Sequence, residues 1–324
     1  MCTGVESMRH LIRLNLMLVM TGMIMGVGLS VDAQPGRNPV LPARKINHLP
    51  NRLRTPPSGT VIAIRSIDGR GNNLAAFDMG AAHTPLLRLV GVGYADGISA
   101  LAGPQRPSPR VISNVVNAQD RLYPNTLGAS DFLWQWEQFL DHDIDLTDGV
   151  DPPELADIAV PRGDLWFDPK GEGGVVISFN RSVYDPETGT SRDNPREQVN
   201  EITTWIDASN VYGSSAERAA ALRTLDGTGR LRTSTGELLP FNTSGLPNAG
   251  GDSETLFLAG DVRANEQVGL AAMHTLFVRE HNRLAEELAT TYPNLTGDEV
   301  YQRARTMVIA QMQLTSDRVL QCCF

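Results

Sequence analysis

One short stretch concentrates the residues that are able to do acid–base chemistry. Gln138, Asp141, His142 and Asp145 are spaced i, i+3, i+4 and i+7, so they share one face of a helix. A His with a Gln one turn before it suits proton transfer, with the His as general base, although a lone buried His is more commonly structural. Asp143 lies about 100° round the same helix from His142, so it must serve a different neighbour.

Metal binding is the second chemistry to consider. Adjacent side chains on a helix cannot all face one ion, so the run 141–143 is weak evidence for a single-metal cluster. Thr203, Asp207 and Ser209 offer oxygen atoms at i, i+4 and i+6. A hard cation such as calcium takes about six to eight oxygens, so carbonyls and a further carboxylate would have to complete the shell. Taken alone, such a segment is more often a polar turn than a calcium loop.

The residues between Gln138 and Asp145 share a face only if they lie on a helix, and the sequence has the signals of a helix start before them. Ser130 is a suitable N-cap, Asp131 suits a first turn, and no Pro or Gly follows until Gly149. Ser215 caps a second helix that reaches Leu222.

Two long helices are expected after these, over residues 265–289 and 300–320. The first has one apolar stripe at three- and four-residue spacing, and Thr296 and Glu299 form a capping box ahead of the second. The other segments are rich in Gly, Pro and Asn, with a short strand expected in 174–179 and a hairpin in 230–258. The predicted fold is mostly α-helical, with long ordered loops and minimal β structure. The stripe consists of Leu270, Met273, Phe277, Leu284 and Leu288.

Composition and the N-terminal residues indicate which partners and which cellular compartment to expect. The net charge of −9 argues against a nucleic-acid partner, and three cysteines are too few for a disulfide framework. Arg9 and Arg13 precede a mostly apolar segment, and Ala33 fits a cleavage site, so residues 1–33 are interpreted as a signal peptide. An uncleaved membrane anchor is the alternative. The expected product is secreted or periplasmic and free of the membrane, with a flexible leader at 34–60 and one domain at 61–324.

Four ordered motifs resemble the animal-type haem peroxidases. They read QFLDHD at 138–143, TTWIDASNVYGS at 203–214, GDVRANE at 260–266 and MHTLFVREHNRLA at 273–285. The resemblance extends over roughly residues 66–315 and implies the helical fold of that family. It also implies haem b as cofactor, with hydrogen peroxide and a small electron donor as reactants.

The resemblance assigns roles on the haem side of the helix. His142 would take a proton from peroxide and return it to the leaving oxygen, and Gln138 would hydrogen-bond within the same pocket. Arg263 would stabilise the negative charge that develops. Asp141 and Glu266 match the carboxylates that form ester links to haem methyl groups.

The resemblance also implies calcium on the other side of the helix. Asp143 would be one ligand, and holding it would fix the neighbouring His142. The remaining ligands would be Thr203, the Trp205 carbonyl, Asp207 and Ser209.

Two features depart from the family pattern. Gln267 stands where some members carry a Met that is joined to the haem vinyl, so that link is not expected here. The family's proximal haem-ligating His lies beyond the matched motifs, so the chain is expected to lack the C-terminal part of the domain. The six histidines are His10, His48, His83, His142, His274 and His281; the last two could ligate haem, but structural packing is the commoner role for helical histidines.

The resulting expectation is a secreted haem peroxidase that reduces hydrogen peroxide and oxidises a halide, thiocyanate or small organic donor. Two other hypotheses stay open. The chain could be a catalytically inactive fragment that keeps the calcium site, or an extracellular binding module that uses the same fold.

Overall fold

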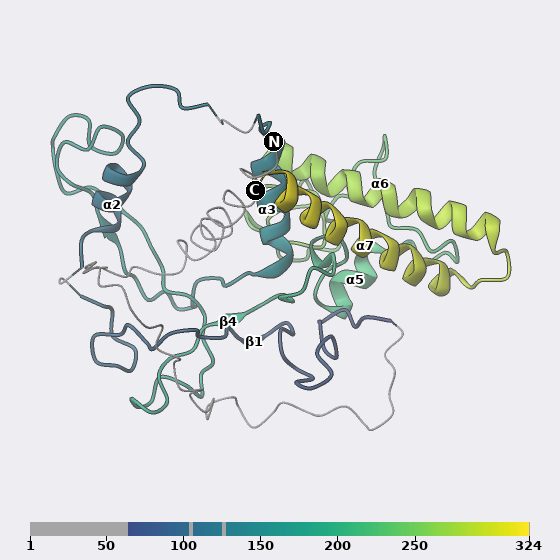
Figure 1. The fold of residues 1–324 in the computed structure, drawn as a ribbon, viewed down its shortest axis with the longest axis horizontal. Helices are drawn as coiled ribbons and strands as arrows, with labels where there is room; N and C mark the ends of the chain where they lie inside the picture. Colours follow the sequence, from purple (N-terminus) through teal and green to yellow (C-terminus); the bar gives the residue numbers. More distant parts are fainter. Residues whose placement is uncertain (1–63, 104–105, 125–127, 324) are drawn as a thin grey trace, which may run out of the picture. The chain divides into compact units, whose positions relative to one another are not determined.

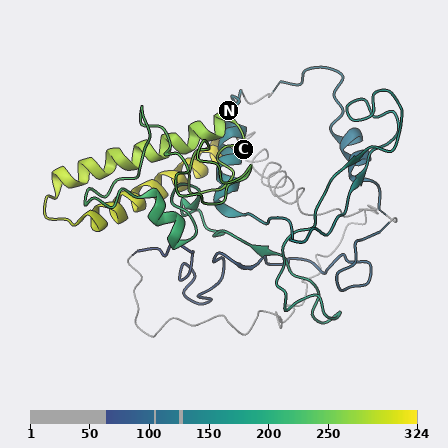
Figure 2. The ribbon, with the colours of Figure 1, turned by 180° about the vertical axis from the view of Figure 1, so that it is seen from behind.

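The described part of the chain is mostly helical. A computed structural model describes residues 64–103, 106–124 and 128–323, so the expected signal peptide and leader lie outside the described residues. Figures 1 and 2 show helices joined by long loops. The described helices are α2 (Pro109–Val116), α3 (Phe132–Ile144), α4 (Ser209–Tyr212), α5 (Ala216–Leu222), α6 (Val268–Thr291) and α7 (Gly297–Cys323).

Strands are few and short, as the sequence predicts. β1 (Thr84–Pro85) pairs antiparallel with β4 (Val199–Asn200), and β2 (Ile158–Ala159) pairs antiparallel with β3 (Val176–Ile177). The strand expected within 174–179 is therefore confirmed at its centre. The hairpin expected within 230–258 is present only as isolated antiparallel bridges, Ser234–Leu238 and Phe241–Phe257, and not as a continuous ladder.

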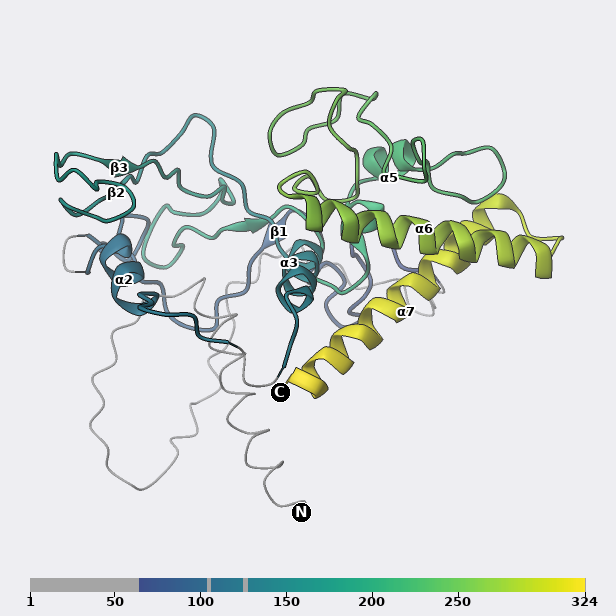
Figure 3. The ribbon, with the colours of Figure 1, turned by 90° about the horizontal axis from the view of Figure 1, so that it is seen from above.

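Helix α3 carries the residues of interest and packs against α6. Its N-cap is Asp131, one residue later than the predicted Ser130, and it ends at Ile144 because Asp145 has an extended backbone (φ −148°, ψ 148°). The rings of Phe139 on α3 and Phe277 on α6 are stacked, with centroids 5.1 Å apart. Figure 3 shows α3 beside the beginning of α6. This packing fixes the rotation of α3, and therefore which face meets which neighbour.

The long helices begin at side-chain caps. Gln267 accepts a hydrogen bond from the Gly269 amide at 2.6 Å at the start of α6. The predicted apolar stripe of α6 is buried except at Leu288, which is half-buried. The predicted capping box of α7 is present: Glu299 Oε2 accepts from the Thr296 amide at 2.8 Å, and Thr296 Oγ1 accepts from the Glu299 amide at 3.3 Å.

Two compact units divide the chain. One covers Pro50–Met312, and the other joins Met1–Leu49 to Gln313–Phe324. All of the site residues described below belong to the first unit. Among the described helices, none combines the length and apolar character that a membrane span requires.

Candidate functional site

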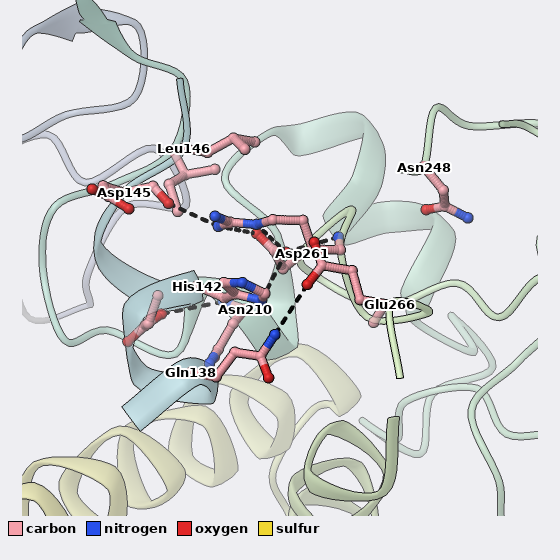
Figure 4. A network of polar contacts seen from close by, with 12 residues as sticks. Gln138, His142, Asp145, Leu146, Asn210, Asn248, Asp261 and Glu266 are labelled. Atoms are coloured by element: carbon pink, nitrogen blue, oxygen red, sulfur yellow. Dashed lines mark hydrogen bonds and ion pairs between the residues drawn. The ribbon is translucent and has the colours of Figure 1, made fainter. Parts of the chain in front are cut away.

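His142 lies near the end of α3 with its ring almost fully buried. Its Nδ1 atom is buried without a hydrogen-bond partner among the described residues. The nearest recorded charged group is the Asp261 carboxylate, whose Oδ1 is 3.6 Å from Nδ1. Figure 4 shows the polar network around these two residues, with Gln138 and Glu266 on one side and Asp145 on the other.

Arg263 is held by the same carboxylate. Its Nε donates to Asp261 Oδ1 and its Nη2 to Asp261 Oδ2, each at 2.9 Å. Nη2 also donates to the Asp145 carbonyl at 2.8 Å, which is available because α3 has ended there. Such forked contacts fix the guanidinium plane. The structure thus brings His142 and Arg263, which are far apart in the sequence, to one buried acid.

The electrostatics of this group favour a neutral His142. Burial lowers the pKa of His142 to about 4, and the charge of Arg263 acts in the same direction, whereas Asp261 opposes both. Burial would also lower the pKa of Arg263, but the hydrogen bonds and charge of Asp261 outweigh it and raise that pKa. A neutral imidazole beside a fixed cation can accept a proton at neutral pH.

Gln138 belongs to a chain of amides next to this group. Its Nε2 donates to Glu266 Oε2 at 3.0 Å, and its Oε1 accepts from Gln267 Nε2 at 3.0 Å. Gln267 Nε2 also donates to Gln135 Oε1 at 2.7 Å. Gln267, the departure from the family pattern, is therefore engaged in orienting Gln138. Glu266 is exposed.

Asp141 lies on the same helix and is half-buried. Burial, with a smaller contribution from the charge of Asp145, raises the pKa of Asp141 to about 6. The charge of Glu266 also acts on Asp141, so these two carboxyl groups are neighbours, one half-buried and one exposed to solvent.

Asp143 points to the opposite side, as the helix geometry predicts. It is fully buried. Its Oδ1 accepts from Ser209 Oγ at 2.9 Å and from the Asn210 amide at 3.2 Å, and its Oδ2 accepts from the Ala208 amide at 3.1 Å. The start of α4 therefore closes around this carboxylate.

Asp207 is a second buried carboxylate beside the first. Its Oδ1 accepts from Thr203 Oγ1 at 2.9 Å and from the Ser209 amide at 3.2 Å, but its Oδ2 is buried with no partner in the described chain. Burial raises the pKa of both carboxyls, and the charge of Asp207 raises that of Asp143 further. The Trp205 carbonyl accepts from the Asp207 amide at 2.8 Å.

These oxygens fit a hard cation better than any other group. Two buried acids, two hydroxyls and a carbonyl form an all-oxygen donor set. The buried Asp207 Oδ2 has no hydrogen-bond partner among the described residues, although the charges of Arg305 and Arg65 act on this carboxyl and lower its pKa. The residues that the structure describes hold no group of three or more His, Cys, Asp or Glu side chains able to bind a metal. Hydroxyl, carbonyl and solvent oxygens would therefore have to supply most of the shell.

The two histidines of α6 are both fully buried. His281 is satisfied, with Nδ1 2.8 Å from Tyr212 Oη and Nε2 3.0 Å from the Gly229 carbonyl, as expected of a structural histidine. His274 meets the Phe139 ring edge-on at 5.0 Å, and neither of its nitrogens has a hydrogen-bond partner within the described ranges. Neither ring is open to an external ligand.

Sequence reasoning missed Asp261. Only 2% of the Asp261 surface is exposed to solvent, and its carboxylate contacts both His142 and Arg263. The available signal was its place two residues before Arg263 in a loop segment, where an acid and a base can pair locally. A lone Asp in a turn carries too little information for that interpretation by itself.

Comparison with known proteins identifies the relatives of this chain. The profile of the family described as animal haem peroxidase matches residues 64–316. Dual oxidase 1 of Caenorhabditis elegans is 34% identical over 256 residues, which cover 76% of this chain and 17% of that protein. The human peroxidasin homolog is 35% identical over 298 residues, covering 77% and 19%. Among solved structures, peroxidase A of Dictyostelium discoideum matches with a TM-score of 0.67 and 30% identity, covering 77% of this chain and 51% of that one. The chain thus spans less than a fifth of these two sequence relatives and about half of the solved peroxidase.

Proposed function

The chain belongs to the animal haem peroxidase family, and from this premise we propose that it forms the peroxide-handling side of a haem peroxidase site. The reaction is reduction of hydrogen peroxide coupled to oxidation of a halide, thiocyanate or small organic donor. Haem, when bound, supplies the redox-active iron at which peroxide is reduced.

The observation that carries the proposal is the arrangement of His142 and Arg263 on one buried acid. Nδ1 of His142 is buried, whereas Nε2 is not among the fully buried atoms and is the nitrogen that can meet a substrate. With its pKa lowered by burial, the ring is neutral and Nε2 takes a proton from peroxide and later returns it. Arg263 uses Nε and Nη2 on protein acceptors, so Nη1 is left to stabilise negative charge on the departing oxygen.

The residues around His142 fit a haem edge. Glu266 accepts a hydrogen bond from Gln138, and Asp141 follows Gln138 by three residues on α3, which places both on one helix face. Asp141 and Glu266 are the two groups proposed to attach to haem. Gln138, held by Gln267, orients the substrate's hydrogen bonds. The buried pair Asp143 and Asp207 is proposed to bind calcium, which would hold α3 at the residue next to His142.

Export is part of the proposal and rests on the sequence of residues 1–33 alone. It places the chain in the secreted or periplasmic space. Detection of a mature protein that begins near Gln34 outside the cytoplasm would support it, and a full-length cytoplasmic product would contradict it.

The test is an absorption titration of the full chain with haemin, followed by peroxide and a donor. Because the family's proximal histidine lies beyond the matched motifs, imidazole is added as the axial ligand. We then expect a Soret band at one haemin per chain and donor oxidation that depends on peroxide. His142→Gln should keep the band and lose turnover by about 10²- to 10⁴-fold, the usual contribution of general acid–base catalysis. His83→Gln is the matched control, because His83 is exposed and its recorded hydrogen bond is from its backbone amide.

The opposite result is equally definite. A broad free-haem spectrum without turnover would reject the proposal and favour the inactive fragment. Capture of a protein partner by the haem-free chain would then favour the binding module.

A further inference from the structure

Asp261 is the buried acid on which both reactive side chains converge. Its Oδ1 accepts from the Arg263 amide at 2.8 Å and from Arg263 Nε at 2.9 Å, and its Oδ2 accepts from Arg263 Nη2 at 2.9 Å. Oδ1 also lies 3.6 Å from His142 Nδ1. Among the described residues, Asp261 is therefore the recorded ion-pair neighbour of the His142 ring. It also accepts two of the three recorded side-chain hydrogen bonds of Arg263.

The position of Asp261 is set by the backbone. Its amide donates to the Asn210 carbonyl at 3.0 Å, and the Asn210 side chain donates to the Phe139 carbonyl on α3 at 2.6 Å. Phe139 is three residues before His142 on the same helix. The acid is thus tied through Asn210 to the helix that carries the His, so the two groups keep a constant spacing.

The chemistry of the two groups fixes where the imidazole proton lies. A carboxylate is an acceptor only, and leaving a buried ring nitrogen without a partner is unfavourable. The contact is favourable only if Nδ1 carries the proton. The separation exceeds a normal N–H···O hydrogen bond, about 2.7–3.2 Å, by roughly half an ångström. Hydrogen bonds at catalytic sites are commonly long in the unliganded state and tighten with substrate.

We propose that Asp261 is a positioning residue that selects the Nδ1–H tautomer of His142 and at the same time fixes the plane of Arg263. In this tautomer Nε2 of His142 keeps a free lone pair, and Nη1 of Arg263 keeps its protons free to donate. The single side chain of Asp261 determines both. The catalytic meaning of this arrangement rests on the function proposed above. The tautomer itself is a property of the chain without haem.

The test is nitrogen-15 spectroscopy of the histidine rings in the full, haem-free chain, where long-range nitrogen–proton correlations distinguish the two tautomers. A His142→Gln variant assigns the His142 signals by their loss. We expect His142 in the Nδ1–H form. Asp261→Asn should shift it towards Nε2–H, because one amide oxygen remains and Arg263 competes for it.

Two comparisons separate positioning from general damage. Glu266→Gln also removes one negative charge from the polar network, but Glu266 bonds to Gln138 and not to His142, so the tautomer should not change. The His281 signals report folding in the same spectra, because that ring is held by Tyr212 and Gly229.

The outcomes are decisive in each case. A wild-type His142 in the Nε2–H form, or a folded Asp261→Asn variant with an unchanged tautomer, overturns the inference. If the variant loses the His281 signals, the wild-type spectrum decides alone. In the haem-loaded chain, Asp261→Asn should lower peroxide turnover about 10²-fold. A wild-type chain without turnover would reject the proposed function and leave the tautomer result standing.

Discussion

Asp207→Asn is the sharpest test of the buried acid pair. Oδ1 of Asp207 already accepts from Thr203 Oγ1 and from the Ser209 amide, and the oxygen of an Asn can keep both bonds. The substitution changes the group at Oδ2, which is buried and has no partner among the described residues. It therefore removes a charge at almost constant shape.

The expected effect changes sign with calcium. Without calcium, the variant removes a buried carboxyl. Burial raises the pKa of both Asp143 and Asp207, and the charge of Asp207 raises that of Asp143 further, so the variant should be as stable as the wild type or more so. With calcium at 100 times its dissociation constant, the wild type gains about 2.7 kcal/mol. For a domain of this size that is a rise in melting temperature of about 5–10 °C. The variant should gain far less, because a hard cation loses an anionic ligand.

The assay is thermal unfolding of the full chain in chelator, in calcium and in magnesium. Asp226→Asn is the matched control, since Asp226 sits in an exposed turn and accepts from Thr224 and Thr228. It should keep the full response to calcium. An equal calcium response in Asp207→Asn and the wild type would refute the assignment, as would a wild type that does not respond.

Three further predictions concern packing and pH. Thr296→Ala removes one half of the α7 capping box and should cost about 1 kcal/mol in urea unfolding. Tyr212→Phe leaves His281 Nδ1 buried without its partner and should cost about 1–3 kcal/mol, whereas Tyr123→Phe, at an exposed site, should cost little. Burial lowers the pKa of His281 from 6.5 to about 4, so the unfolded chain binds the proton more readily between these values. Stability should therefore fall as pH drops from 6.5 to 4, by about 3 kcal/mol from this residue, and His281→Gln should show a shallower pH dependence.

The sequence predicted the parts of the site that depend on helix periodicity. His142 and Asp143 are adjacent, and a rotation of about 100° per residue sends them to different neighbours, as the contacts with Asp261 and Ser209 confirm. Helix caps were also predictable because they are local, which is why Ser215 was identified correctly.

The features that the sequence did not reveal depend on contacts between distant segments. Helix α2 (Pro109–Val116) was missed because it is short and lies among turn residues. Its apolar residues Val111, Ile112, Val115 and Val116 share one face, but none of them is buried. Asp261 was missed because its importance comes from His142, which is more than a hundred residues away along the chain. Gln267 was noticed as a departure from the family, but its bonds to Gln135 and Gln138 needed the fold.

Asn210 connects the residues on the two sides of α3 by hydrogen bonds. Its amide donates to Asp143 Oδ1, its carbonyl accepts from the Asp261 amide, and its side chain donates to the Phe139 carbonyl. Asn210, which is fully buried, is therefore bonded both to Asp143 of the acid pair and to Asp261 beside His142. A cation that draws Asp143 towards Asp207 would act on the same short segment that positions Asp261. Because that segment is hydrogen-bonded to α3, the proposed binding at the acid pair would stabilise the geometry of His142 and Arg263 without touching either side chain.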